Sequence, residues 1–541
     1  MPSSSEAKVK TWCSKLPAAA PFHSPGSGVA RTKSDLAWFR WSAINMCSAK
    51  QFMVSDSAQS LKVWKAKGAF ILWIGQNGLV SKLSAQPLSP LDGRYQSQVG
   101  DLGLWLSEAG LNRARIQVEI AWLIFLAKND TLGTGSKLSD TEVSKLQALY
   151  GADFGDDSVA ALAKIEAVTR HDVKAIEYFI RDALKEMGRE DLNELVHFAC
   201  TSEDINNLAY ALTIKGALED IWLPKAKNLV AKIKKQALEL ADLPMLSRTH
   251  GQPATPSTMG KELAVFVYRL ERQLKKLENQ EILGKFSGAT GTFAAHLAAA
   301  PKVDWLATSK SFVEQLGLEW NPLTTQIESH DWQAELYGTI AHFNRILHNL
   351  ATDFWTYISI NYFKQIPVAG ATGSSTMPHK VNPIRFENAE ANLEISNALF
   401  DSLASTLVTS RLQRDLTDSS AQRNIGVAFG HSMLALDNLT RGLDEVAINE
   451  EVLAQDLLEN WEVLGEAIQT AIRADVARGE SSISDPYALL KELTRGKRVG
   501  AQDLADFIEK LEVSGETKDR LLALTPALYV GLAPEIAKRL K

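Results

Sequence analysis

Apolar residues recur with a helical period along most of the chain after about residue 89. In residues 332–360 they alternate in steps of four and three, which predicts a long helix with an apolar seam suited to bundle packing. Residues 257–283, 385–409 and 421–446 have similar patterns. The apolar positions of the first stretch are Leu336, Ile340, Phe343, Leu347, Leu350 and Phe354. These patterns predict a central bundle of long helices, with seams that are also candidates for contact between subunits.

Alternating strand patterns of useful length are scarce, and no regular strand–helix–strand order is present, so an all-α fold is favoured. Ser107 is placed to cap a helix at its N-terminus. Glycine and proline residues predict a loop between two helices at 370–383. We divide the chain into an extension (1–85), an N-terminal helical domain (86–200), a central bundle domain (201–449) and a C-terminal helical domain (450–541).

The first 85 residues differ in charge from the rest. They hold 11 Lys or Arg against three acidic residues, a balance of +8, whereas the whole chain has a net charge of −6, so the remainder carries −14. This stretch is Ser-rich and contains tryptophans without a steady period. It is interpreted as a disordered extension or as sequence upstream of the true start site. Organelle targeting is the alternative, since transit peptides have a similar composition.

The overall composition is that of a soluble globular protein. Of 541 residues, 45% are hydrophobic and 23% are charged. The acidic balance gives no general reason to expect nucleic-acid binding, and no apolar run is long enough to span a membrane. Three cysteines cannot form a disulfide framework and have no zinc-ligand spacing, so we expect an intracellular protein. No metal-binding, dinucleotide-binding or P-loop motif is present.

Two loops carry the residue types of proton transfer. The loop 373–383 contains Ser375, Lys380 and Asn382 among glycines that permit close approach to a ligand, which suits an anion site. A serine can act as a base only if its alkoxide is stabilised, for which a lysine and backbone amides are suitable. His250 lies among turn residues before a long helix, where it is available for proton transfer. An ordinary linker and a surface histidine are the structural alternatives.

Three further segments are polar. Arg170, His171 and Asp172 lie together, although Asp172 also suits a helix cap. Residues 201–204 resemble a capping box, whose amides and hydroxyls would also suit a phosphate or carboxylate. Arg414 and Arg423 can clamp a phosphate, or they can form weak ion pairs on a solvated helix.

Together these segments resemble the fumarase/aspartase superfamily, whose signature loop is matched by residues 373–383. Residues 91–95, 171–175, 201–208, 249–256 and 414–419 match, in order, the branch that cleaves succinylated purine nucleotides. The resemblance runs from about residue 86 to the C-terminus. One departure is Ser329, where a proline is expected before His330, which puts a loop detail in question.

The resemblance implies a three-domain all-α fold that assembles into a homotetramer with active sites shared between subunits. It implies β-elimination of fumarate from adenylosuccinate, giving AMP, and from the succinylated aminoimidazole carboxamide ribotide SAICAR, giving AICAR. By similarity His250 is the general acid and Ser375 the general base, and no cofactor is required. The substrate-binding residues implied are Arg94, Tyr95, Arg170, His171, Asp172, Thr201, Ser202, Gln326, Lys380, Asn382, Arg414, Ser419 and Arg423.

Two alternatives stay open at this point. A superfamily lyase acting on argininosuccinate, fumarate or aspartate would share the serine-rich loop, and an inactive structural relative would share the fold. The segments around Arg94, Thr201 and Arg414 favour a nucleotide phosphate, and the presence of both His250 and Ser375 favours an enzyme. We expect a cytoplasmic protein with small-molecule nucleotide substrates and no nucleic-acid or membrane partner.

Overall fold

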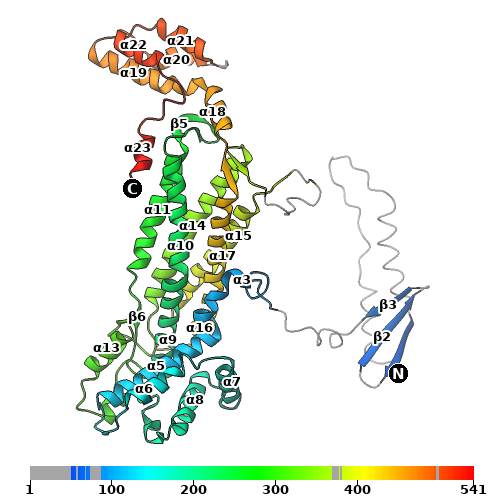
Figure 1. Ribbon diagram of the computed structural model, residues 1–541, viewed down its shortest axis with the longest axis vertical. Helices are drawn as coiled ribbons and strands as arrows, with labels where there is room; N and C mark the ends of the chain where they lie inside the picture. Colours follow the sequence, from blue (N-terminus) through cyan, green and yellow to red (C-terminus); the bar gives the residue numbers. More distant parts are fainter. Residues whose placement is uncertain are drawn as a thin grey trace. The chain divides into compact units, whose positions relative to one another are not determined.

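The computed structural model describes residues 50–56, 59–66, 69–73, 87–367, 377, 380–494 and 499–540 (Figure 1). The chain divides into two compact units, residues 1–87 and 88–541. In the first unit, β1 (Lys50–Asp56), β2 (Gln59–Ala66) and β3 (Ala69–Trp73) form an antiparallel sheet in sequence order. The interpretation of residues 1–85 as an extension stays a prediction, and so do the proposed domain boundaries.

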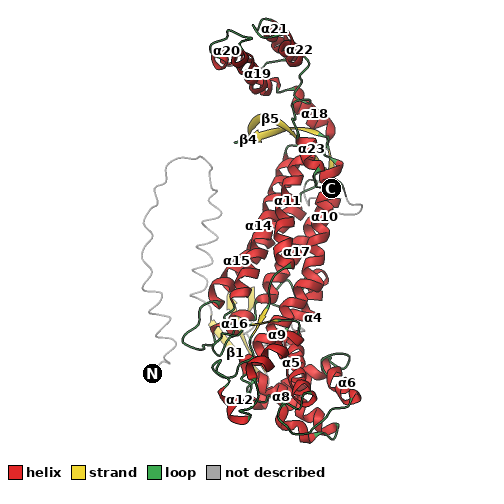
Figure 2. Cartoon of the chain, turned by 90° about the vertical axis from the view of Figure 1, so that its left-hand side faces the viewer, coloured by secondary structure: helices red, strands yellow, loops and turns green. Residues whose placement is uncertain are grey.

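The long helices of the second unit run alongside one another (Figures 1 and 2). They are α9 (Ser202–Gly216), α10 (Leu223–Glu239), α11 (Met259–Glu278), α14 (Asp331–Ser359), α15 (Ile384–Leu407) and α17 (Ile425–Asp444). A π-helical turn, η4 (Ala217–Trp222), joins α9 to α10 without a break. The all-α prediction is therefore confirmed, and α14, α15 and α17 lie close to their predicted bounds.

The predicted apolar seam of α14 is the centre of the core. All six of its apolar positions, from Leu336 to Phe354, are fully buried. Neighbouring rings extend this packing, since Phe354 stacks on Phe386 of α15 with ring centroids 5.2 Å apart. Burying side chains of this kind contributes roughly 1.5–3 kcal/mol each, so the seam holds the bundle together.

One end of the bundle is covered by α5 (Glu108–Lys128) and a group of mostly shorter helices. The others are α3 (Gln96–Val99), η2 (Gly100–Leu102), α4 (Gly103–Leu106), α6 (Asp140–Ala148), α7 (Asp156–Thr169), α8 (Asp172–Glu186), η3 (Glu190–Leu195), α12 (Ala294–Ala299), α13 (Trp305–Gln315) and α16 (Thr417–Gln422). The Ser107 hydroxyl accepts a hydrogen bond from the Gly110 N–H at 3.0 Å, which confirms the predicted cap of α5. A short parallel pair, β6 (Leu283–Gly284) and β7 (Glu319–Trp320), lies between these helices.

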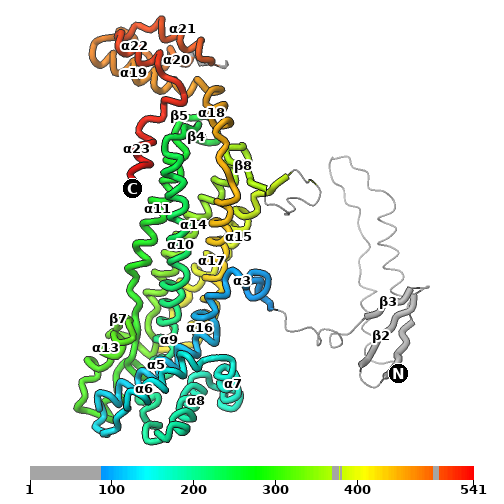
Figure 3. The backbone as a smooth tube through the Cα atoms, viewed as in Figure 1, coloured from blue at the N-terminus to red at the C-terminus, as the bar shows by residue number. Residues whose placement is uncertain are grey.

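The other end carries a hairpin of β4 (Pro244–Thr249) and β5 (Gln252–Thr258), and the pair β8 (Phe363–Gln365) and β9 (Val446–Ile448). The chain continues through α18 (Glu450–Leu458), η5 (Trp461–Leu464), α19 (Gly465–Arg478), α20 (Pro486–Thr494), α21 (Ala501–Glu509) and α22 (Gly515–Leu522). Finally α23 (Ala533–Lys538) returns to pack on α11 (Figure 3). Among the helices of the described ranges, none has the length and apolar composition needed to cross a membrane.

Candidate active site

Arg115 joins three helices at the end of the bundle that α5 covers. Its guanidinium donates to Asp172 Oδ2 at 2.8 Å and to Asn206 Oδ1 at 2.9 Å, and its side chain is only 2% exposed. It therefore ties α5 to the first residues of α8 and to the first turns of α9. We call this end the charged end; it comprises the paired side chains Glu108, Arg115, Asp172, Glu203, Asp204, Asn206, Lys285, Arg414 and Arg423.

Arg423 reaches the same carboxylate from the end of α16. Its Nη1 donates to Glu108 Oε2 at 2.8 Å, and its Nη2 lies 3.6 Å from Asp172 Oδ2. Burial opposes ionisation of Asp172, but Arg115, the Val173 N–H and the other nearby charges outweigh it and lower the pKa of Asp172. The carboxylate is therefore held ionised between two guanidinium groups.

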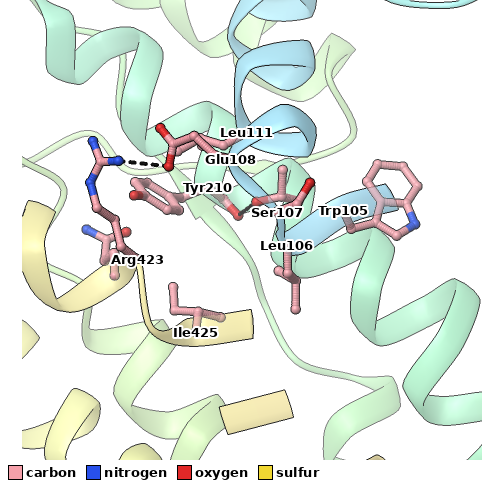
Figure 4. A pocket seen from close by; sticks show the side chains of 10 residues that line it. Trp105, Leu106, Ser107, Glu108, Leu111, Tyr210, Arg423 and Ile425 are labelled. Carbon is pink, nitrogen blue, oxygen red and sulfur yellow. Dashed lines mark hydrogen bonds and ion pairs between the residues drawn. The ribbon is translucent and has the colours of Figure 1, made fainter. Parts of the chain in front are cut away.

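A small pocket opens beside this pair, lined by residues from α4, α5, α9 and the segment leading into α17 (Figure 4). Arg423 and Glu108 lie at one side of it, joined by their ion pair, and Tyr210 contributes its ring. Burial raises the pKa of Tyr210 to about 12, so its hydroxyl stays protonated and can donate a hydrogen bond.

Thr201 and Ser202 open α9 above a buried ion pair. Asp204 Oδ2 accepts the Thr201 N–H at 2.8 Å, which is the return bond of the predicted capping box. Asp204 Oδ1 lies 2.7 Å from Lys285 Nζ, and neither side chain is exposed. The same carboxylate accepts the N–H group of Ser287 at 2.8 Å. Asp204 thus fixes the start of α9 to the loop that follows β6.

Gln326 is connected to this loop. Its amide donates to the carbonyl of Ala289 at 2.9 Å, and the nearby Thr324 hydroxyl lies 3.1 Å from that of Ser287. The structure therefore brings Gln326 to the same region as Thr201, as the sequence-based grouping of these residues requires.

Arg414 belongs to the charged end but is already paired. Its Nη1 lies 2.8 Å from Glu203 Oε1 and 3.6 Å from Asp418 Oδ2. Asp418 also accepts the Ser419 N–H at 2.6 Å and lies 3.5 Å from Nε2 of His330, which is almost fully buried. Arg414 therefore links α9 to the segment before α17, and its predicted role in clamping a phosphate with Arg423 stays a prediction.

The remaining predicted residues of this region are more exposed. Arg94 lies 5.8 Å above the ring of Tyr95, and Tyr95 packs against the main core. Arg170 is exposed and adopts a left-handed conformation with φ of 53°. His171 is the N-cap of α8, because its Nδ1 accepts the Lys174 N–H at 3.2 Å. The cap role open to Asp172 therefore belongs to His171.

His250 lies at the opposite end of the bundle. It forms the two-residue turn of the β4–β5 hairpin with Gly251, with φ of 53° and 74° respectively, and is exposed. Below the turn, Arg248 donates to Asp456 Oδ2 at 2.5 Å, and the Tyr362 hydroxyl donates to the same oxygen. Asp456 therefore ties the hairpin to the segment leading into β8.

Lys380 and Asn382 lie shortly before α15, at the same end of the bundle as the hairpin. Lys380 is exposed, and Asn382 is half-buried. Ser375, the predicted base, lies outside the described residues. We call this the hairpin end; it comprises the β4–β5 turn and the described residues 377 and 380–383.

The two ends are far apart within one chain. Residues 202–239 form a continuous helical run, and at 1.5 Å per residue its length is about 57 Å. Thr201 precedes this run, whereas His250 follows it by a short strand. A single chain therefore does not place His250 beside the charged end.

Several residues of the charged end do not stand out in the sequence. Glu203 and Asn206 lie within the matched segment 201–208, and their spacing of three residues puts them on one helix face, which is a usable signal. Glu108, Arg115 and Lys285 have no such signal, because their partners lie elsewhere in the chain. Within the described residues, no group of three or more His, Cys, Asp or Glu side chains is arranged to hold a metal ion.

Comparison with known proteins agrees with these features. A family model described as lyase matches residues 93–394, and one described as adenylosuccinate lyase C-terminal matches residues 410–530. The chain is 48% identical to the adenylosuccinate lyase of Escherichia coli (strain K12), covering 85% of this chain and 100% of the relative. It is 47% identical to that of Haemophilus influenzae, covering 84% and 98%.

Among solved structures, 3-carboxy-cis,cis-muconate lactonizing enzyme from Pseudomonas putida has a TM-score of 0.64 at 22% identity, covering 82% of this chain and 97% of that one. At this identity the likeness concerns the fold alone. From the sequence matches, the chain belongs to the adenylosuccinate lyases, a family of carbon–nitrogen lyases in the fumarase/aspartase superfamily.

Proposed function

We propose that this protein cleaves adenylosuccinate to fumarate and AMP, and SAICAR to fumarate and AICAR, in purine nucleotide synthesis. The observation that carries the proposal is the sequence identity with adenylosuccinate lyases along their whole length. The charged end supports it, because Arg423 lines a small pocket there, and an arginine suits a ligand that carries a phosphate and carboxylates.

In the proposed reaction, Ser375 removes the proton from the succinyl β-carbon and the electron pair of that bond forms the double bond of fumarate. The carbon–nitrogen bond breaks, and His250 protonates the departing nitrogen. Positioned proton transfers of this kind contribute about 10² to 10⁴ in rate each. Lys380 and Asn382 are proposed to stabilise the carboxylate that gains charge in the carbanion.

The remaining predicted residues are proposed to hold the substrate. Thr201, Ser202 and Gln326 would contact the succinyl and base portion, and their grouping around the Asp204 loop supports this. The phosphate and ribose are assigned to the other residues of the charged end and its surroundings. These are Arg94, Tyr95, Arg170, His171, Asp172, Arg414, Ser419 and Arg423. For Arg414 this role requires exchange of the Glu203 partner for substrate.

We further propose a homotetramer in which the hairpin end of one chain completes the charged end of another. The separation of about 57 Å along residues 202–239 supports shared sites. Exposed apolar side chains on the bundle helices support subunit contact, including Val265 (41%), Tyr268 (61%) and Ile395 (46%). A cytoplasmic location is proposed on the low cysteine content of the chain.

The test is turnover of adenylosuccinate by the purified full-length protein, followed by its change in ultraviolet absorbance. We expect conversion to AMP, and near-complete loss of activity in His250→Ala and in Ser375→Ala. Turnover of argininosuccinate without turnover of adenylosuccinate would overturn the nucleotide assignment. Full activity in Ser375→Ala would overturn the assignment of the base.

A further inference from the structure

The four residues before Thr201 form a turn with unusual backbone geometry. His197 and Ala199 both have left-handed conformations, with φ of 58° and 56°. Residues other than glycine adopt this region rarely, and they keep it only where surrounding contacts fix it. One such contact is Trp122 of α5, whose indole N–H donates to the carbonyl of Phe198 at 3.0 Å.

The second contact is stronger and comes from Glu119, also on α5. Its Oε1 lies 2.6 Å from Nδ1 of His197, and its Oε2 accepts the backbone N–H of His197 at 3.0 Å. Both carboxylate oxygens of Glu119 thus bind the same residue, His197. Glu119 is not exposed, and His197 is 17% exposed. A buried carboxylate of this kind needs a positively charged or donating partner, and His197 supplies one.

We propose that the Glu119–His197 ion pair is a positioning device for substrate binding, which holds residues 197–200 in their left-handed turn and so sets the position of Thr201 and Ser202. His197 is a positioning residue in this inference, because it contacts α5 and α8 and acts through the start of α9. The inference rests on the proposed function, in which Thr201 and Ser202 contact the substrate.

The charges around His197 favour its protonated form. Glu119 faces it from α5, and Glu177 Oε1 of α8 lies 3.9 Å from its Nε2, while Lys174 pairs with the other oxygen of Glu177 at 2.7 Å. Asp204 faces it from α9. Burial lowers the pKa of His197, but the hydrogen bond and charge of Glu119, with Glu177 and Asp204, outweigh this and raise it above its ordinary value.

The direction of the pH effect follows from this shift. Because the pKa of His197 is raised, the Glu119–His197 ion pair is fully formed at pH values below the ordinary histidine pKa. The pair is lost as the pH rises through the pKa that His197 has in the folded protein. The Cys200 thiol in the same turn does not ionise over the same pH range as His197, because burial raises the pKa of the thiol well above its ordinary value. We therefore expect KM for adenylosuccinate to rise on the alkaline side while kcat changes less.

The experiment compares Glu119→Gln and His197→Asn in the full-length protein. Asparagine tolerates the left-handed conformation, so the second variant removes the charge with little strain. The matched control is Glu142→Gln, which loses a 2.6 Å ion pair with Arg189 in the same helical region. We expect each test variant to raise KM about tenfold, as loss of a charge-assisted hydrogen bond can do, and the control to change KM less than about twofold.

The pH profile separates positioning from simple loss of stability. In Glu119→Gln the rise in KM begins at lower pH than in the wild type, and in His197→Asn it is absent. The inference would be overturned if both variants kept the wild-type KM and the wild-type rise of KM at alkaline pH. It would also be overturned if the control Glu142→Gln raised KM as much as the test variants do. If Glu119→Gln does not fold, His197→Asn alone decides between these outcomes.

A direct titration keeps the inference separate from the proposed function. If the wild type does not turn over adenylosuccinate, the proposed function fails, and the His197 imidazole is followed by nuclear magnetic resonance. A His197 pKa that stays the same in Glu119→Gln would then overturn the ion pair. A pKa that falls supports the pair independently of turnover.

Discussion

The two ends of the bundle use charge in different ways. At the charged end, side chains are paired and several are buried, as are Arg115, which pairs with Asp172, and both members of the Lys285–Asp204 pair. At the hairpin end, His250 and Lys380 are exposed. The first arrangement is suited to holding a ligand in a fixed position, and the second to presenting reactive groups to a partner. Neither end of one chain contains all the groups that the proposed reaction requires.

The largest effect expected from this difference is complementation between inactive chains. We expect His250→Ala, altered at the hairpin end, and Arg423→Ala, altered at the charged end, each to be nearly inactive alone. Assembling the two together places an intact hairpin end against an intact charged end at some sites. We therefore expect activity to return in the mixture, measured by adenylosuccinate turnover after co-expression.

The control for this experiment is a mixture of two charged-end variants, Arg423→Ala and Asp172→Asn. Because both residues belong to the charged end of the same chain, every charged end in this mixture carries one of the two substitutions, and no active site is intact. Recovery of activity in the control, or no recovery in the first mixture, would contradict the separation of the two ends.

A second expected effect concerns the buried pair at the charged end. Lys285→Met leaves Asp204 buried without its cation, which costs about 3–5 kcal/mol in the free energy of unfolding. Lys261→Met is the matched control. Its ion pair with Glu262 is 3.0 Å long and the Lys261 side chain is 33% exposed, so the pair contributes less than about 1 kcal/mol to the free energy of unfolding. Urea unfolding measures both. Equal losses in the two variants would mean that burial does not distinguish these pairs.

The smallest effect is expected below the hairpin. Arg248→Met removes the pair with Asp456, in which the two side chains are 33% and 20% exposed. Because solvent screens such a pair, the expected loss is less than about 1 kcal/mol in the free energy of unfolding. The measurement is thermal unfolding. The control is Arg441→Met, which loses a comparable 3.0 Å ion pair with Asp437. A loss as large as that of Lys285→Met would mean that the hairpin end also depends on buried charge.

The sequence predicted the long helices well, because burial of one face imposes a period that can be read directly. Residues 332–360 were predicted to be helical, and α14 covers Asp331–Ser359. The predicted helix 257–283 is shorter in the structure, since residues up to Thr258 continue β5 and α11 ends at Glu278. That strand contains two prolines and lacks alternation, which is why the hairpin around His250 was not predicted.

The grouping of the site residues stays a prediction, because it depends on how subunits come together. Resemblance assigned thirteen substrate-binding residues to sites shared between subunits, and within one chain Lys380 and Asn382 lie at the opposite end of the bundle from Thr201. Motif order along a sequence carries no information about which subunit contributes each motif. The partners that hold the site residues, such as Arg115 and Lys285, depend on contacts between distant segments, for which one sequence gives no periodic signal.

The Asp204–Lys285 pair also has a consequence for synthesis of the chain. Asp204 leaves the ribosome about 80 residues before Lys285, so at roughly 5–20 residues per second it waits about 4–16 seconds for its partner. During that time its carboxylate must stay hydrated, since burial without the lysine is costly. The start of α9 therefore cannot close over it until the loop after β6 has been made, and the charged end is assembled late although its first residues are made early.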